Sequence, residues 1–272
     1  MIQVETIEKI VKYTLASGRL EGEKPLSLIM VANPECGKTS IIRRCCLKAG
    51  NVFYTTDATA FGIIRDTNQL QDFKSGKLTH IVIPDLLTCL GRKQATVTTF
   101  VSFMNALIEE GVISLSTYAT QFRGETEVKA GLITAIPPGP FKDKRRHWGQ
   151  IGFISRALPV SFDYQLSTQV AILSYIQQQK YLEEKIEELK IPEKQEKVIL
   201  PTDMAKQIEP YAVALAAAQS PYQKLYGFRY QKQLQTFVKA IALMEGKEEV
   251  DDWCVQELGR LANFINLQFN NI

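Results

Sequence analysis

The run Gly37-Lys38-Thr39 carries the clearest chemical signal in this chain of 272 residues. It ends the stretch ANPECGKTS, Ala32 to Ser40, whose spacing fits the phosphate-binding loop G-x-x-x-x-G-K-[ST], except that alanine replaces the first glycine. In such a loop the backbone N–H groups and the positive end of the next helix hold phosphates, the lysine reaches the terminal phosphates, and the threonine hydroxyl binds Mg²⁺. An ordinary turn between a strand and a helix is the alternative interpretation. The residues that we predict to bind ATP here are Asn33, Pro34, Glu35, Cys36, Gly37, Lys38, Thr39 and Ser40.

A buried strand that ends on an acid is the second signal. The segment Ile81 to Pro84 is apolar and is followed by Asp85, at the position where P-loop ATPases hold the water shell of their Mg²⁺. We therefore assign Asp85 to the metal together with Thr39, against the alternative of a plain turn at the strand end. The next residue is Leu86, where many such ATPases carry the glutamate that orients the attacking water, so hydrolysis needs another acid or is slow. The weak substitutes in the sequence are Glu109 and Glu110, at the end of the next expected helix.

Arginine and lysine side chains indicate two further kinds of contact. Arg156 lies in the apolar segment GFISRALP, which suits an arginine that reaches across a subunit interface to a neighbour's γ-phosphate. Two alternating segments, 112–119 and 128–136, predict a hairpin whose polar turn lies around Gly124. A loop KDKRRHW, from Lys142 to Trp148, combines basic residues with an aromatic ring, as phosphate contact and base stacking require. A solvated surface is the alternative for both segments, and the predicted nucleic-acid contacts are Arg123, Lys142, Lys144, Arg145 and Arg146.

Hydrophobic patterns place these residues on an α/β framework. A strand over 26–31 precedes the phosphate loop, a helix follows it, and a short strand ends near Asp57. Residues 3–16 have the spacing of an amphipathic helix. From about residue 165 the chain reads as a long helix to Lys190, a linker and three more helices. We therefore predict a P-loop domain over 1–164, with a parallel sheet flanked by helices, and a small all-helical lid domain over 165–272.

Composition excludes several classes of protein. The chain is 45% hydrophobic and 22% charged, and its apolar runs are far shorter than the ~20 residues that span a bilayer. We expect no contact with a membrane and a cytoplasmic location. Five cysteines without a C-x-x-C pair, and only two histidines, indicate neither a disulfide framework nor a zinc site. The net charge of +3 is too small to establish a nucleic-acid partner by itself.

Together these motifs resemble an AAA+ ATPase of the minichromosome-maintenance and MoxR-like branch, over about Lys24 to Leu267. ANPECGKT matches Walker A apart from its first residue, IVIPD matches Walker B as far as the aspartate, and ISR is similar to the branch's L-S-R arginine-finger motif. The predicted hairpin stands where that branch has a hairpin before its sensor-1 strand. The usual sensor-1 asparagine corresponds to Ile136, so the resemblance leaves Thr134 as the polar substitute. It also implies that Lys232, with Arg229 as the other candidate, is the sensor-2 residue of the lid.

The resemblance implies a homo-oligomeric ring, expected to be a hexamer, with ATP and Mg²⁺ bound between the two domains and at a subunit boundary. In that arrangement Lys38 and Asp85 hold the phosphates and metal, and Arg156 acts on the neighbour's nucleotide. We expect an ATPase that works on nucleic acid such as DNA, as a helicase or a replication accessory. The alternatives are a MoxR-like protein-remodelling ATPase with a protein partner, and a weakly hydrolysing, nucleotide-gated scaffold.

Overall fold

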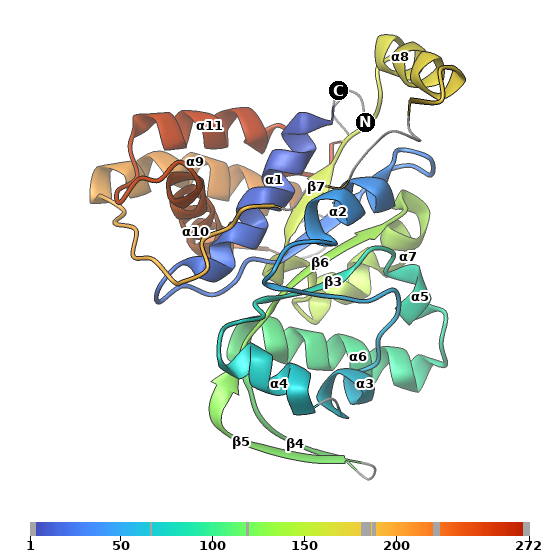
Figure 1. Cartoon of the computed structure of the whole chain (residues 1–272), viewed down its shortest axis with the longest axis vertical. Helices are drawn as coiled ribbons and strands as arrows, with labels where there is room; N and C mark the ends of the chain where they lie inside the picture. The colour runs from blue at the N-terminus through green and yellow to red at the C-terminus, as the bar shows by residue number, and fades with distance from the viewer. Residues whose placement is uncertain are drawn as a thin grey trace.

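The centre of the protein is a parallel five-stranded sheet with helices on both faces (Figure 1). The computed structural model describes residues 4–65, 67–117, 120–180, 186, 189–219 and 224–268, with the backbone alone at 64, 67, 68, 114–117 and 120–126. The sheet has the strand order β2-β3-β6-β1-β7, and an antiparallel pair, β4 with β5, forms a separate hairpin. The strands are β1 Leu28–Val31, β2 Val52–Tyr54, β3 His80–Ile83, β4 Val112–Thr117, β5 Thr120–Val128, β6 Gly131–Ile136 and β7 Leu158–Ser161.

Helices form the outer layers. The first half contains α1 Glu5–Ala16, η1 Ser17–Arg19, α2 Lys38–Cys46, α3 Ala60–Arg65, α4 Thr67–Lys74, α5 Leu87–Leu90, α6 Gln94–Asn105 and η2 Ala106–Glu110. The second half contains α7 Pro138–Gln150, η3 Ile154–Arg156, α8 Leu166–Gln177, α9 Thr202–Gln219, α10 Phe228–Met244 and α11 Asp252–Ala262. Among the residues described above, no helix is both long enough and apolar enough to cross a membrane.

Side-chain alternation along the strands divides the interior into two cores. In β1, Leu28 and Met30 pack against α1, α2 and the C-terminal helices, whereas Ile29 and Val31 face the layer of α3 to α7. Successive side chains of a strand point to opposite faces, so a strand that is apolar throughout needs a helical layer on each side. The helices α9 to α11 share one of these cores with α1 and the sheet. The predicted boundary at residue 165 therefore falls within a continuous hydrophobic core, and the two-domain division stays a prediction.

A buried polar cluster fixes the start of β1. The imidazole of His80 is fully buried; its Nε2 donates to the Leu26 carbonyl oxygen (3.1 Å), and its Nδ1 accepts from the Thr79 hydroxyl (2.9 Å). Burial lowers the pKa of His80 from 6.5 to about 4. Gly131 leaves the space for this arrangement, since a Cβ atom there would lie 2.2 Å from the Leu26 carbonyl oxygen. The cluster joins β3 and β6 to the residues that lead into β1.

Most of the predicted elements are present. The N-terminal helix, the strand before the phosphate loop, the helix after it, the strand before Asp85 and the three C-terminal helices all form as the patterns indicated. The helix expected to end near Glu109 and Glu110 is α6 followed by the π-helical turn η2, and Gly111 directly after it takes φ 84°. The α/β fold with a parallel sheet, followed by C-terminal helices, is therefore confirmed.

Three local predictions were wrong. The hairpin does not turn around Gly124, because β5 continues through that residue and Arg123 pairs with Ser114 inside the ladder. The segment from Lys142 to Trp148 is not a loop but part of α7. The long helix after residue 165 ends as α8 at Gln177, and the described residues between 189 and 200 are not helical.

Candidate functional site

The segment between β1 and α2 forms the candidate site. Because the sheet strands are parallel, the segments that follow them meet at one edge, here called the carboxyl edge, and those that precede them meet at the opposite, amino edge. The loop after β1 turns through two residues of positive φ, Glu35 (67°) and Gly37 (71°). The helix α2 begins at Lys38, no side chain caps it, and its first turn has no acidic residue. Its positive end is therefore available to an anion at the carboxyl edge.

The side chain of Lys38 folds back onto the loop between β1 and α2. Its Nζ atom donates to the carbonyl oxygens of Ala32 and Asn33, each at 2.7 Å. Burial lowers the pKa of the Lys38 ammonium, while the neighbouring Cys36 and Asp85 act in the opposite direction. The ammonium therefore stands at the centre of the loop, near enough to Asp85 for their charges to interact.

Asp85 and Thr39 stand at the carboxyl edge with exposed side chains. The Asp85 Oδ1 atom accepts from the Leu87 N–H (3.0 Å), which orients the carboxylate at the start of α5. These two residues fit Mg²⁺, because an ion bound together with nucleotide phosphates takes only one or two oxygen ligands from the protein. When bound, the ion would neutralise charge on the phosphate oxygens.

The end of β7 contributes residues that sequence reasoning missed. The Asp163 carboxylate accepts from the Asn33 amide (3.2 Å) and approaches the Cys36 thiol, and the Tyr164 hydroxyl donates to the Cys36 carbonyl oxygen (2.7 Å). Burial is the main cause that raises the pKa of the Tyr164 phenol to about 12 and also raises that of the Cys36 thiol. The phosphate loop is thus supported from β7, a neighbour that only the pairing of β7 with β1 reveals.

Arg156, Arg229 and Lys232 come together at the amino edge. They line one cavity of about 240 Å³ with Glu109 and other residues. Arg156 precedes β7, and its guanidinium donates to the Gly152 carbonyl oxygen (2.9 Å) and pairs with Glu110 (3.1 Å). Arg229 donates to the Ser155 hydroxyl (3.0 Å). Three predicted site residues are therefore neighbours, and they lie across the sheet from the phosphate loop.

This placement corrects two expectations. Lys232 lines a cavity with Arg156, and no loop residue from Asn33 to Ser40 lines it, so Lys232 does not cover the loop of its own chain. Glu109 pairs with Lys24 (3.0 Å) and Arg229 (3.8 Å) at the amino edge, and Glu110 pairs with Arg156. Neither glutamate can orient a water at the carboxyl edge.

Thr134 is buried within the sheet. Its side chain has no solvent exposure, and its hydroxyl has no hydrogen-bond partner within the described part of the chain. It lies in β6 opposite Ile29 and Ile83, two residues before the strand ends. Its role as the polar substitute at sensor 1 stays a prediction, which the buried position of the hydroxyl does not support.

The segment 142–148, which was expected to be a loop, belongs to α7. Some of its side chains are held within the protein and others are exposed. Trp148 is 2% exposed and packs edge-on against Phe141 and Phe153, so it cannot stack on a base. Arg145 donates to the Ala218 carbonyl oxygen (3.0 Å) at the end of α9. The side chains that remain exposed are Lys142 and Arg146, one helical turn apart, with Lys144 half-buried. The side chain of Arg123 lies outside the described atoms.

A second cavity lies away from the phosphate loop. It measures about 980 Å³ and is lined at the amino edge by residues that precede β2 and β3, including Asn51 and Lys77, together with the segment 189–195. We do not assign it to the nucleotide, because the loop and Asp85 stand at the other edge.

No protein-family model and no curated protein matches this chain.

Proposed function

We propose that this protein binds and hydrolyses ATP with Mg²⁺, as an AAA+ ATPase that works as a ring. The observation that carries the proposal is the loop between β1 and α2, which joins an uncapped helix N-terminus to a half-buried lysine at the carboxyl edge. Asp85 stands at the same edge, on the far side of β6 from β1. This combination is suited to phosphates and an oxygen-ligated ion, and it is the arrangement that Walker A and Walker B motifs require.

The positions of the arginines and of the phosphate loop, at opposite edges of the sheet, support assembly of several copies of the chain. Arg156 and Arg229 precede or flank β7 at the amino edge, so they cannot reach a phosphate held by the loop of the same chain. They can stabilise the charge on a γ-phosphate only when a second copy brings its carboxyl edge against them. Before it does so, Arg156 must leave its pairing with Glu110, because its side chain is only 11% exposed.

The helix α8 supports the same assembly. It begins two residues after Tyr164, whose hydroxyl holds the loop, and it stands away from the rest of the molecule in Figure 1. Its exposed apolar side chains are Leu166 (75%), Val170 (58%), Leu173 (58%) and Ile176 (51%). An exposed apolar stripe of this kind marks an interaction surface. Because it is anchored at the carboxyl edge, we assign it to contact with the next copy of the chain.

For the substrate of the motor we propose nucleic acid. The hairpin of β4 and β5 extends from the body of the molecule (Figure 1), and Lys142 and Arg146 form a small exposed basic stripe on α7. Because the ring of Trp148 is buried, binding at α7 would rest on phosphate contacts and would weaken as salt rises. A nucleotide-gated scaffold is the second candidate, favoured by the burial of Leu86 (1% exposed) where a water-orienting acid is usual.

The test is steady-state ATP turnover measured against protein concentration, with and without single- and double-stranded DNA. Lys38→Ala is the blank, and a fluorescent ATP analogue reports binding separately. The ATPase predicts turnover above the blank that rises per subunit with concentration, and the nucleic-acid motor predicts a further rise with DNA. Binding that Lys38→Ala abolishes, with turnover no higher than the blank in every condition, would replace the motor with the scaffold. Equal binding by wild type and Lys38→Ala would refute the nucleotide site itself.

A further inference from the structure

We propose that Asp57 is the carboxylate that orients and deprotonates the attacking water, in place of the acid that is missing at Leu86. This inference rests on the proposed ATPase and names one more of its catalytic residues. Asp57 follows β2, and β2 pairs in parallel with β3, the strand that ends at Asp85. The two carboxylates therefore lie at the carboxyl edge on neighbouring strands.

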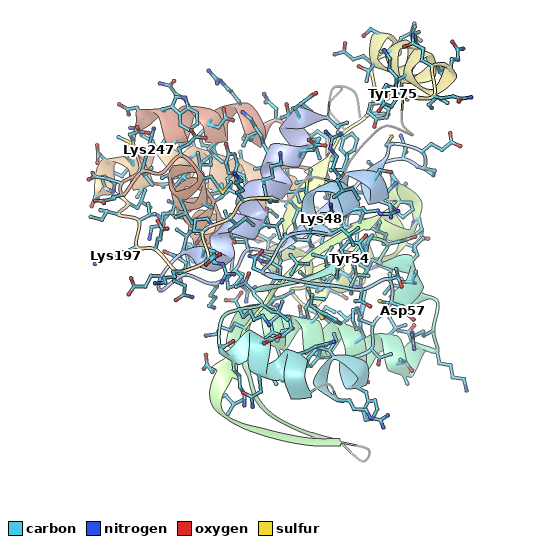
Figure 2. The ribbon with its side chains drawn as sticks, in the orientation of Figure 1. Lys48, Tyr54, Asp57, Tyr175, Lys197 and Lys247 are labelled. Atoms are coloured by element: carbon cyan, nitrogen blue, oxygen red, sulfur yellow. The ribbon has the colours of Figure 1, made fainter. Side chains whose placement is uncertain are left out.

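Contacts through α5 join the two acids. The Thr88 hydroxyl lies 2.9 Å from the Thr56 carbonyl oxygen and 2.9 Å from that of Asp85, so one side chain bridges both strand ends. The next residue, Cys89, approaches Asp57 Oδ1 with its sulfur (3.6 Å). Figure 2 shows Asp57 beside α5. Asp57, Asp85 and the loop lysine thus follow one another along the same edge of the sheet.

The other acids near the site are less well placed. Asp163 follows β7, which β1 and β6 separate from β3, and its carboxylate is already used to hold Asn33 and Cys36. Glu109 and Glu110 lie at the amino edge. Asp57, in contrast, is 42% exposed and accessible to water, and its ion-pair partner is Arg92, an exposed residue just after α5. The ion pair with Arg92 turns the carboxylate toward α5.

ATP hydrolysis can be written in full with Asp57 as the general base. A water oxygen forms a bond to the γ-phosphorus while the bond from that phosphorus to the β–γ bridging oxygen breaks. The Asp57 carboxylate accepts a proton from the water and later releases it to solvent. The products are ADP and phosphate, and general-base assistance of this kind contributes about 10²–10⁴-fold to a rate.

Three variants test whether Asp57 acts as a base or only stabilises the structure around it. Asp57→Asn keeps the size of the side chain and removes the base, Asp57→Glu keeps the base, and Arg92→Gln breaks the same ion pair while leaving Asp57 in place. For each variant we would measure kcat, the affinity for the fluorescent analogue, and the ratio of ATP to ADP that stays bound after incubation and gel filtration. We expect Asp57→Asn to lose about 10²-fold or more in kcat, to bind nucleotide as wild type does, and to retain ATP. Asp57→Glu should recover part of the turnover that Asp57→Asn loses, and Arg92→Gln should keep turnover near that of wild type.

Each other outcome overturns the inference. If Asp57→Asn turns over like wild type, Asp57 is not the base, while the proposed ATPase stands. If Arg92→Gln loses as much turnover as Asp57→Asn, the residue acts through its ion pair and not on water. If wild type shows no turnover above Lys38→Ala, the proposed hydrolysis fails, and the role of Asp57 fails with it.

Discussion

The buried imidazole of His80 makes the stability of this protein depend on pH, in a direction that the structure fixes. The His80 pKa is lowered to about 4 in the folded protein, whereas an unfolded histidine has its ordinary value near 6.5. Between about pH 6.5 and pH 4, the His80 imidazole is therefore protonated in the unfolded chain but neutral in the folded chain. The contribution of His80 to stability is constant above about pH 6.5, falls as the pH drops toward 4, and levels off below it.

The size of the effect follows from the gap between the two pKa values. The gap between about 6.5 and about 4, at about 1.4 kcal/mol per pH unit, corresponds to about 3 kcal/mol when the titration is complete. Between pH 7.5 and pH 4.5 the expected loss is about 2–3 kcal/mol, because the folded protein has begun to bind the proton at the lower pH. This is a large share of the 5–15 kcal/mol that is typical of a folded domain.

The assay is urea unfolding of wild type and His80→Gln at both pH values. The glutamine variant starts less stable, because it loses the contacts to Leu26 and Thr79. The difference in unfolding free energy between the two proteins should shrink by about 2–3 kcal/mol at pH 4.5. Taking this difference cancels the titration of carboxylates, which both proteins share. The same loss in both proteins would refute the reasoning.

If His80→Gln does not fold, an NMR titration of the His80 imidazole can replace the unfolding assay. The sequence has two histidines, so the His147→Gln variant leaves His80 alone. His147 is exposed on α7, and its replacement leaves the buried cluster intact. The remaining imidazole signal in an NMR titration should stay constant from pH 7.5 to pH 5. A midpoint near 6.5 would show that His80 is not held neutral.

Two further predictions concern packing and assembly. Gly131→Ala should lower the free energy of unfolding by about 1–3 kcal/mol or more, because its Cβ would lie 2.2 Å from the Leu26 carbonyl oxygen. Gly139→Ala is the control, at a position in α7 with open space around it, and should raise the free energy of unfolding by up to about 1 kcal/mol. Equal urea midpoints for the two variants would contradict the predicted clash between the new Cβ atom at residue 131 and the Leu26 carbonyl oxygen. Leu173→Glu should leave the unfolding of the monomer within about 0.5 kcal/mol of wild type and reduce assembly with ATP in analytical ultracentrifugation. Gln177→Glu, on the exposed end of the same helix, is the charge-matched control, and equal assembly of both variants would exclude α8 from the interface.

The sequence alone determined the parts of the site that depend on neighbouring residues. The spacing from Ala32 to Thr39, an apolar strand before it and a helix after it are local patterns, and each appears in the structure where it was expected. The same holds for Asp85, because an apolar run followed by an acid already places that acid at a strand end. The periodicity of the C-terminal helices likewise follows from residues three and four apart.

The basic segment of α7 shows where a local interpretation failed although a signal was present. Lysines and arginines around a tryptophan resembled a loop for nucleic acid. Pro138 at the start, with Phe141 and Trp148 seven residues apart, is equally the pattern of a helix with one buried side. Only the neighbouring Phe153 and the core behind the helix decide that the tryptophan ring is covered.

The order of the strands is what only the tertiary structure decided. Pairing between distant segments places β2 beside β3, β6 between β3 and β1, and β7 on the far side of β1. That order brings Asp57 next to Asp85, supports the phosphate loop with Asp163, and gathers Arg156 and Lys232 at the opposite edge. No local pattern carries this information, because an all-apolar strand with helices on both faces can pair with any similar strand on either side.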